Sequence, residues 1–503
     1  MVLDKTFLTL SKSRLKAINE YERYPDTIQY EQLRTLLAQA RNTEWGKKYD
    51  YARIRSYEDF AAGTPIQDYD DVKPYIIRML HGESNLIRPE KITWFAQSSG
   101  TTNDKSKYIP IGKAALEQCH YRGPQDLIAT YLNNVPGSRI FSGKGLILGG
   151  SHRPLEYEHN RKVYVGDLSA VLISNMNPLA NCFRIPSKKI ILMNEWEKKL
   201  ELICKYTINR NVTNLSGVPS WFMVLINKIL AETKKENLTE IWPNLEVFFH
   251  GGISFTPYRE QYKALIPSPQ MHYMETYNAS EGFFALQNDL SDPSLLLMLD
   301  YGVFYEFIPI EAIDSGNPPA VRLQDVELNR NYAMVITTNS GLWRYKIGDT
   351  IRFTCLKPYK IVITGRTKHY INAFGEELMV GNVEKALSAA CLQTSTKIKE
   401  YTVAPVYMSG RSKGKHQWLI EFEQAPDSLQ AFALILDDML KTLNSDYEAK
   451  RYKNITLDFP EITVARKDLF YDWLKRKGKL GGQNKIPRLS NTREYIDSIL
   501  SIN

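Results

Sequence analysis

Residues 145–282 alternate short apolar segments with stretches of helical periodicity, and this alternation restricts the fold more than any other feature of the chain. The apolar segments are closed by Gly, Ser or Asn, and they are residues 145–151, 189–196, 212–221, 244–252 and 271–282. We predict each as a strand, with a helix over residues 222–235 (FMVLINKILAETKK). Strands that alternate with helices are typical of α/β sheets, in which ligands lie at the carboxyl ends of the strands.

The flanking segments have different patterns. The first ninety residues place apolar positions at helical spacing among charges, which predicts helices on the outside of a domain. Further on, the patterns predict a β-rich part at 295–310, 331–349 and 360–366, then helix at 383–392, strands at 401–407 and 416–423, helix at 429–450 and strand at 455–465. We therefore predict an α/β fold with a large N-terminal domain (1–365) of α/β subdomains plus the β-rich part. A small α+β C-terminal domain (366–503) follows it.

Composition excludes several classes of protein. The 503 residues carry a formal net charge of +8, with Lys and Arg scattered among Asp and Glu, so no basic stripe predicts nucleic-acid binding. The five cysteines are an odd number at unrelated spacings, which fits a reducing compartment better than a disulfide framework or a zinc site. No apolar run reaches about 20 residues, and no signal peptide is recognisable. We expect a cytoplasmic protein without a membrane partner.

Residues 98–110 (SSGTTNDKSKYIP) combine small and hydroxyl side chains with one lysine. Backbone amides and hydroxyls in such a loop can surround a phosphate chain, and Lys107 would add a point charge. The segment predicts a grip for a nucleoside triphosphate. Its spacing is not GxxxxGK[ST], which occurs nowhere in the chain, so a P-loop NTPase is disfavoured.

The chain resembles a known family along most of its length. The similar segments are the loop at 98–110, PIQDYDDVKPYIIRMLHGE (65–83), YNASEGFF (277–284), YKIGDTIRF (345–353), ITGRTKHYINAFGEEL (363–378) and NKIPR (484–488). They resemble, in order, motifs of the plant acyl-acid-amido synthetases that join auxin, jasmonate or benzoates to amino acids, and of their bacterial relatives, in the acyl-adenylate-forming superfamily. Two positions depart from the family pattern: Ala279 replaces a Ser, and Gly282 replaces a Cys.

The resemblance implies ATP and Mg²⁺ as cofactors. It assigns the β- and γ-phosphates of ATP to Lys107 and to the loop residues Ser98, Ser99, Gly100, Thr101 and Thr102. Glu281 would bind Mg²⁺, because a hard cation that bridges phosphates prefers oxygen ligands. Tyr277 would stack on adenine, and the backbone of Gly251 and Gly252 would lie close to the ring.

The resemblance also assigns roles on and beyond the β-rich part. Asp349 would accept hydrogen bonds from the ribose hydroxyls, as an aspartate that closes a strand. Arg366 would contact the phosphate or ribose from a hinge, about which the C-terminal domain is mobile. Lys485 would bridge the attacking carboxylate and the α-phosphate, although Lys475, Lys477 and Lys479 lie near it in the chain.

These assignments imply a ligase that converts a carboxylic acid into acyl-AMP and transfers the acyl group to an amine, in particular that of an amino acid. Its partners would be small molecules. Two alternatives remain open at this point: an acyl-CoA ligase, and a nucleotide-binding protein without activity. His250 lies between an apolar strand and two glycines, which is typical of a satisfied, partly buried side chain rather than a catalytic base.

Overall fold

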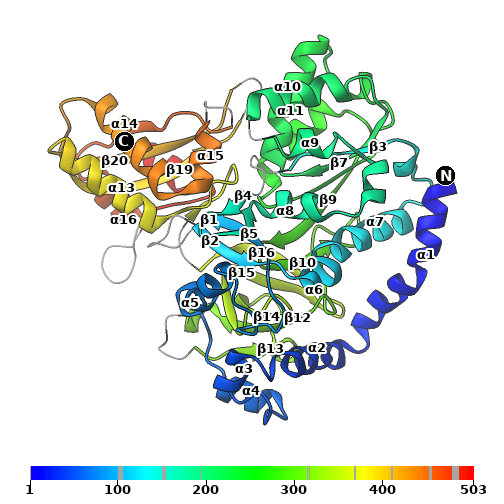
Figure 1. Ribbon diagram of the computed structural model, residues 1–503. Coiled ribbons are helices and arrows are strands. Elements are labelled where there is room, and N and C mark those ends of the chain that lie inside the picture. The colour runs from blue at the N-terminus through cyan, green and yellow to red at the C-terminus, as the bar shows by residue number, and fades with distance from the viewer. Residues whose placement is uncertain are drawn as a thin grey trace.

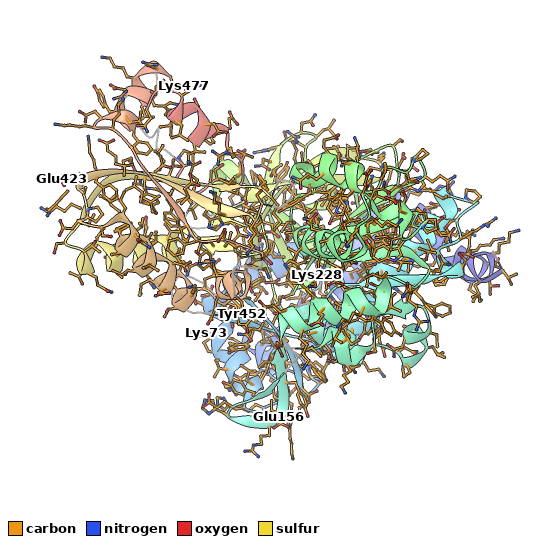
Figure 2. The ribbon with its side chains drawn as sticks, turned by 90° about the horizontal axis from the view of Figure 1, so that it is seen from above. Lys73, Glu156, Lys228, Glu423, Tyr452 and Lys477 are labelled. Atoms are coloured by element: carbon orange, nitrogen blue, oxygen red, sulfur yellow. The ribbon has the colours of Figure 1, made fainter. Side chains whose placement is uncertain are left out.

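Figure 1 shows the computed structural model of the chain: a large unit, and beside it a smaller unit formed by the C-terminal residues. The structure describes residues 2–99, 106–149, 155–193, 195–313, 315, 318–367, 370–408, 412–452, 456–477 and 487–503. In Figure 2, Glu423 and Lys477 mark the part of the smaller unit that points away from the large one. The predicted fold class, a large α/β unit with a small α+β unit after it, is confirmed.

A twelve-stranded sheet of the described residues forms the centre of the large unit, in the order β13-β12-β14-β15-β16-β11-β10-β9-β8-β7-β3-β6. The strands at one end run parallel; they are β6 (Arg184–Ile185), β3 (Lys144–Ile147), β7 (Val212–Gly217), β8 (Val247–Gly251) and β9 (His272–Ala279). The others pair antiparallel; they are β10 (Gly282–Gln287), β11 (Leu295–Leu297), β12 (Val303–Pro309), β13 (Val321–Arg322), β14 (Asn331–Thr338), β15 (Tyr345–Leu356) and β16 (Tyr359–Arg366). The sheet therefore changes from parallel to antiparallel at β9 and β10.

A second sheet, in the order β2-β1-β5-β4, carries the segment predicted to grip phosphates. Its strands are β1 (Trp94–Ser99), β2 (Ser106–Pro110), β4 (Leu155–Tyr157) and β5 (Asn160–Gly166). β1 and β2 are antiparallel neighbours, with Ser98 opposite Lys107. The two ends of the predicted loop are thus held side by side in a hairpin.

Helices surround the two sheets. In the N-terminal part they are α1 (Val2–Asn19), α2 (Pro25–Ala40), α3 (Glu44–Lys48), α4 (Tyr57–Gly63) and α5 (Tyr69–Leu80). Those that follow are α6 (Lys113–Ala115), α7 (Arg122–Asn134), α8 (Leu168–Asn175), α9 (Lys188–Ile191), α10 (Trp196–Thr207), α11 (Pro219–Thr233) and α12 (Arg259–Leu265). Local signals set several boundaries: Ser56 and Asp59 form a capping box at α4, and Pro219 begins α11. The predicted helices of the first ninety residues and of 222–235 are confirmed.

The C-terminal unit has the predicted α+β composition. Its elements are β17 (Tyr370–Ile371), β18 (Leu378–Met379), α13 (Val380–Gln393), β19 (Lys397–Val406), β20 (Lys415–Gln424), α14 (Leu429–Leu443), α15 (Ser445–Arg451), β21 (Glu461–Val464), α16 (Leu469–Arg476) and α17 (Glu494–Leu500). β19 and β20 are antiparallel, and β21 runs parallel to β20.

Two predicted elements are wrong. Residues 189–196, expected as a strand, contain the end of α9 and the start of α10, because a short apolar run does not distinguish a strand from a buried helix. The neighbouring β6 takes the place at the edge of the sheet instead. The single helix expected over 429–450 is broken at Asn444, whose backbone is extended and whose side chain accepts from the backbone N–H of Tyr447 at 2.8 Å. That side chain caps a separate helix, α15.

Two large apolar clusters hold the structure together. One packs the N-terminal helices on the antiparallel half of the sheet. The other combines residues of the parallel strands, such as Phe248 on β8, with residues of the C-terminal unit, such as Phe374 and Trp418. The division at residue 366 stays a prediction. In the described part of the chain, no helix has both the length and the apolar content needed to cross a bilayer.

Candidate active site

Asp349 lies at the centre of the predicted site residues. Its carboxylate accepts a hydrogen bond from the Tyr277 hydroxyl on Oδ2 at 2.6 Å, and one from Nε of Arg366 on Oδ1 at 2.7 Å. Tyr277 and Asp349 are only 5% and 8% exposed. In strand order, β10, β11 and β16 separate Tyr277 on β9 from Asp349 on β15. The direct hydrogen bond therefore shows that this half of the sheet curves back toward β9.

The sequence suggested that Asp349 is the last residue of its strand, and this expectation is wrong. Asp349 lies inside β15, which continues to Leu356. The preceding Gly348 has φ of +93°, a conformation that residues with a Cβ rarely adopt, and the ladder to β16 shifts register after Thr350. This local irregularity lies beside the carboxylate that faces Tyr277.

Glu281 lies in the two-residue turn between β9 and β10 and is 8% exposed. Burial raises the pKa of its carboxyl group above the ordinary value, while the charges of Lys107 and Arg366 act in the opposite direction. Among the residues that the structure describes, no other residue donates a hydrogen bond to this carboxylate or forms an ion pair with it. Glu281 thus presents free oxygen lone pairs near two cationic side chains.

Lys107 projects from β2 toward Tyr69, the first residue of α5. Its Nζ lies 5.6 Å from the centroid of the Tyr69 ring, and the Tyr69 hydroxyl accepts from the backbone N–H of Tyr108 at 2.8 Å. The segment 65–83, singled out in the sequence, therefore holds the phosphate hairpin in place. Ser98 lies opposite Lys107 on β1.

The two glycines lie where β8 ends. Gly251 is the last residue of that strand, and a Cβ there would lie only 2.5 Å from the carbonyl oxygen of Thr276. Gly252 has φ of +83°. Both positions thus require glycine, the first for close approach of backbone and the second for its conformation.

Several predicted residues lie outside the described part of the chain. They are Gly100, Thr101, Thr102 and Lys485. For Ser99 the structure describes the backbone, which pairs with Ser106. The structure therefore brings together Lys107, Tyr277, Glu281, Asp349 and Arg366.

The interpretation of His250 as a satisfied, partly buried side chain is wrong. His250 is 3% exposed, stacks on Phe255 at 4.1 Å between ring centroids, and has no hydrogen-bond partner on Nδ1 in the described structure. Burial lowers its pKa to about 3, so the ring is neutral near pH 7. Its neighbour on β9, Glu275, was missed in the sequence; burial raises the pKa of that carboxyl group to about 7.

Solved structures of two ligases have the same overall fold as this chain. The chain aligns with an acyl acid amido synthetase, AtGH3.15, in complex with 2,4-DB at a TM-score of 0.62, with 19% identity over 98% of this chain and 96% of that one. It aligns with a 2-hydroxyisobutyryl-CoA ligase in complex with 2-HIB-AMP and CoA at a TM-score of 0.57, with 13% identity over 95% and 91% of the chains. The fold is thus one that amide-forming and thioester-forming ligases share.

Family models identify the particular branch. Residues 14–271 match the GH3 family N-terminal domain, 296–366 the central domain and 381–494 the C-terminal domain. The chain therefore belongs to the GH3 family.

Two relatives with assigned activities illustrate its breadth. The chain is 25% identical to an indole-3-acetic acid-amido synthetase of Arabidopsis thaliana, GH3.4, over 96% of this chain and 93% of the relative. It is 23% identical to a 4-substituted benzoates-glutamate ligase of the same plant, GH3.12, over 96% of each.

Proposed function

We propose that the chain is an ATP-dependent acyl-acid amido synthetase. In the first half-reaction, a carboxylate oxygen attacks the α-phosphorus of ATP, which forms acyl-AMP and releases pyrophosphate. In the second, the amine of an amino acid attacks the acyl carbon, which forms an amide and releases AMP and a proton. The relatives named above carry amide-forming activities with different acids, which supports the reaction class and leaves the acid to be found.

The observation that carries this proposal is that the Asp349 carboxylate still has accepting lone pairs beside its two hydrogen bonds. A carboxylate has about four lone-pair sites, and Tyr277 and Arg366 occupy one on each oxygen. One site on each oxygen remains, which matches the two neighbouring hydroxyls of a ribose. Tyr277 and the backbone of Gly251 and Gly252 would then lie on the adenine side of the nucleotide.

Glu281 fits a role as ligand of Mg²⁺. Its carboxylate accepts no hydrogen bond from another described residue, and oxygen is the donor that Mg²⁺ prefers. When bound there, Mg²⁺ would neutralise charge on the phosphates of ATP. Burial raises the pKa of Glu281, and the nearby charges of Lys107 and Arg366 oppose this rise and so favour the ionised form that a metal needs.

The remaining assignments complete the site. Lys107 and the hairpin that begins at Ser98 would hold the leaving pyrophosphate, with Ser99, Gly100, Thr101 and Thr102. Lys485 would offset the charge of the attacking carboxylate, from a C-terminal domain (366–503) that moves relative to residues 1–365. We also propose a cytoplasmic location, which the five free cysteines support.

A screen of carboxylic acids tests the proposal. Release of pyrophosphate is measured with each acid, with and without Mg²⁺, and the product is identified after addition of an amino acid or of CoA. The expected result is pyrophosphate release that depends on the acid and on Mg²⁺, and an amide after addition of an amino acid. A thioester as the only product would favour the acyl-CoA ligase, and ATP binding without turnover on any acid would favour the inactive protein.

A further inference from the structure

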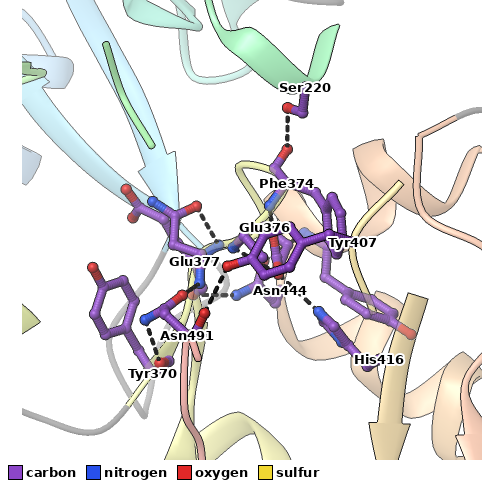
Figure 3. A network of polar contacts seen from close by, with 12 residues as sticks. Ser220, Tyr370, Phe374, Glu376, Glu377, Tyr407, His416, Asn444 and Asn491 are labelled. Carbon is purple, nitrogen blue, oxygen red and sulfur yellow. Dashed lines mark hydrogen bonds and ion pairs between the residues drawn. The ribbon is translucent and has the colours of Figure 1, made fainter. Parts of the chain in front are cut away.

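The C-terminal unit contacts the carboxyl ends of the parallel strands through residues 372–377. Ser220, near the start of α11, donates to the carbonyl oxygen of Phe374 at 3.3 Å, and Asn372 donates to that of Gly252 at 3.3 Å. Figure 3 shows Ser220 above Phe374, and Glu376 beside His416. The Glu376 carboxylate accepts from the backbone N–H of Phe374 at 2.6 Å and contacts Nε2 of His416 at 2.7 Å. Hydrogen bonds therefore hold residues 372–377 against the carboxyl ends of the parallel strands.

Lys450 of α15 lies at this contact. It is 8% exposed, and its Nζ lies 4.2 Å from the centroid of the Trp221 ring on α11. Gly375, with φ of +89°, lies on another side, where a Cβ would come within 3.0 Å of Cε of Lys450 and 3.8 Å of Nε1 of Trp221. The ammonium group is thus enclosed by an aromatic ring and a glycine.

The charge of Lys450 is not paired at short range. Its neighbour Arg451 donates to Asp437 through Nε and Nη2. The ammonium group of Lys450, by contrast, has neither a hydrogen bond nor an ion pair within the described chain. The carboxylates of Asp446, Asp167, Glu376 and Glu377 act on it only from farther away, and burial lowers its pKa. A buried cation without a close anion is costly, so an anionic ligand at this place would be stabilising.

A second buried lysine lies near Lys450. Lys199 of α10 is fully buried, and its Nζ donates to the carbonyl oxygen of Gly149 at 3.2 Å. Lys450 and Lys199 are near enough for the charge of Lys450 to lower the pKa of Lys199, which burial brings to about 8. Asp167 acts on both lysines, and Asp446, Glu376 and Glu377 act on Lys450 as well, but none of these carboxylates forms an ion pair with the Lys450 ammonium group in the described chain.

We propose that Lys450, with Trp221 as the wall beside it, binds the carboxylate of the acceptor amino acid. The inference rests on the proposed function. Lys107 and Arg366 lie beside Glu281, at the proposed nucleotide site. Lys450 contacts Trp221 near the end of β7, and its helix α15 also packs against β1, so this ammonium group lies between the ends of the parallel strands and the phosphate hairpin. The acceptor's carboxylate is the anion that enters only in the second half-reaction. Lys450 would thus select amino acids over simple amines and orient them.

The first test uses the wild-type protein. Amide formation is compared between the best amino acid of a proteinogenic panel and the same amino acid as its α-carboxamide, which lacks the negative charge. A hydrogen bond between charged groups is worth about ten- to a hundredfold in affinity, so the carboxamide should have a KM higher by about that factor. Equal KM values for the two acceptors would overturn the inference, whether or not any variant folds.

The second test uses Lys450→Met, which keeps the length of the side chain and its packing on Trp221. It should raise KM for the amino acid about tenfold or more, leave KM for the carboxamide within about twofold, and leave acid-dependent exchange of pyrophosphate into ATP unchanged. Lys450→Arg should recover part of the amino-acid KM. The control is Lys228→Met on α11, whose partner is Glu232 at 3.2 Å.

The outcomes separate this inference from the proposed function. Loss of pyrophosphate exchange in Lys450→Met would assign Lys450 to the nucleotide or to the fold and overturn the inference alone. An equal rise of KM for the amino acid and for its carboxamide would show that Lys450 does not bind the carboxylate, and would overturn the inference. Absence of acid-dependent exchange in the wild-type protein would overturn the proposed function itself.

Discussion

The acceptor sites of Asp349 predict how strongly the protein distinguishes ATP from 2′-deoxy-ATP. One lone-pair site on each oxygen remains beside the bonds from Tyr277 and Arg366. If each receives a ribose hydroxyl, removal of the 2′ hydroxyl deletes one hydrogen bond to a charged acceptor. Such a bond is worth about 1.5–3 kcal/mol, so 2′-deoxy-ATP should bind about ten- to a hundredfold more weakly than ATP.

The matched perturbation is Asp349→Asn, which keeps the shape but removes the charge and one accepting oxygen. A hydrogen bond between neutral groups is worth about 0.5–1.5 kcal/mol, so the preference for ATP should fall to about tenfold or less. The variant and the deoxy nucleotide should therefore be non-additive by about 1 kcal/mol or more.

The assay is acid-dependent exchange of pyrophosphate into ATP at saturating acid, with KM measured for both nucleotides. The control variant is Asp292→Asn, whose carboxylate accepts from Lys360 at 2.7 Å away from the proposed nucleotide site. The control should retain the wild-type preference. If Asp349→Asn retains it as well, Asp349 does not bind the ribose, and the argument from its lone pairs is refuted.

Three further predictions concern Tyr277, Lys107 and Glu275. Tyr277→Phe should lower the free energy of unfolding by about 1.5–3 kcal/mol, because it removes the hydrogen bond to Asp349. The control is Tyr273→Phe on the same strand, whose hydroxyl has no partner in the described structure, and it should change this free energy by less than about 0.5 kcal/mol. Denaturant titration measures both variants, and equal effects would contradict the prediction. Lys107→Met should reduce the rate of pyrophosphate formation about a hundredfold or more, since a contact to developing charge is worth about 2–4 kcal/mol. The control variant Lys113→Met, at an exposed lysine, should keep the wild-type rate. Normal turnover in Lys107→Met would remove this residue from the mechanism. Burial raises the pKa of Glu275 from 4.5 to about 7 in the folded state, so folding favours the protonated carboxyl group. The contribution of this group to the free energy of unfolding is therefore fully present below about pH 4.5 and is lost as the pH rises through 7. Glu275→Gln should therefore be more stable than the wild-type protein at about pH 8, by up to about 3 kcal/mol, and equally stable near pH 4; a difference independent of pH would show that the carboxyl does not titrate as stated.

The fold could be predicted where local patterns are decisive. The strands that became β7, β8 and β9 were recognisable because each is a short apolar run that ends in small residues, and α11 follows β7 with a proline at its start. The pattern failed for 189–196 and at Asn444, where a short apolar run and a single capping side chain decide the local structure.

The candidate site was predictable in its residues but not in its contacts. The motifs pointed to Tyr277, Glu281, Asp349 and Arg366 one by one. That Tyr277 donates to Asp349 follows from the curvature of a sheet in which three strands separate them, and curvature depends on packing and register shifts across many strands. No spacing along the chain encodes it.

The burial of Lys450 is the clearest example of a property that the sequence alone did not predict. In the chain it reads as one more charged residue in the last turn of a helix, beside Arg451, and such residues are usually solvated. The amino-acid order determined the helix and its charge. Only the tertiary structure, by laying Trp221 and Gly375 of distant segments against it, decided that this charge is buried, because burial is a property of what packs around a side chain.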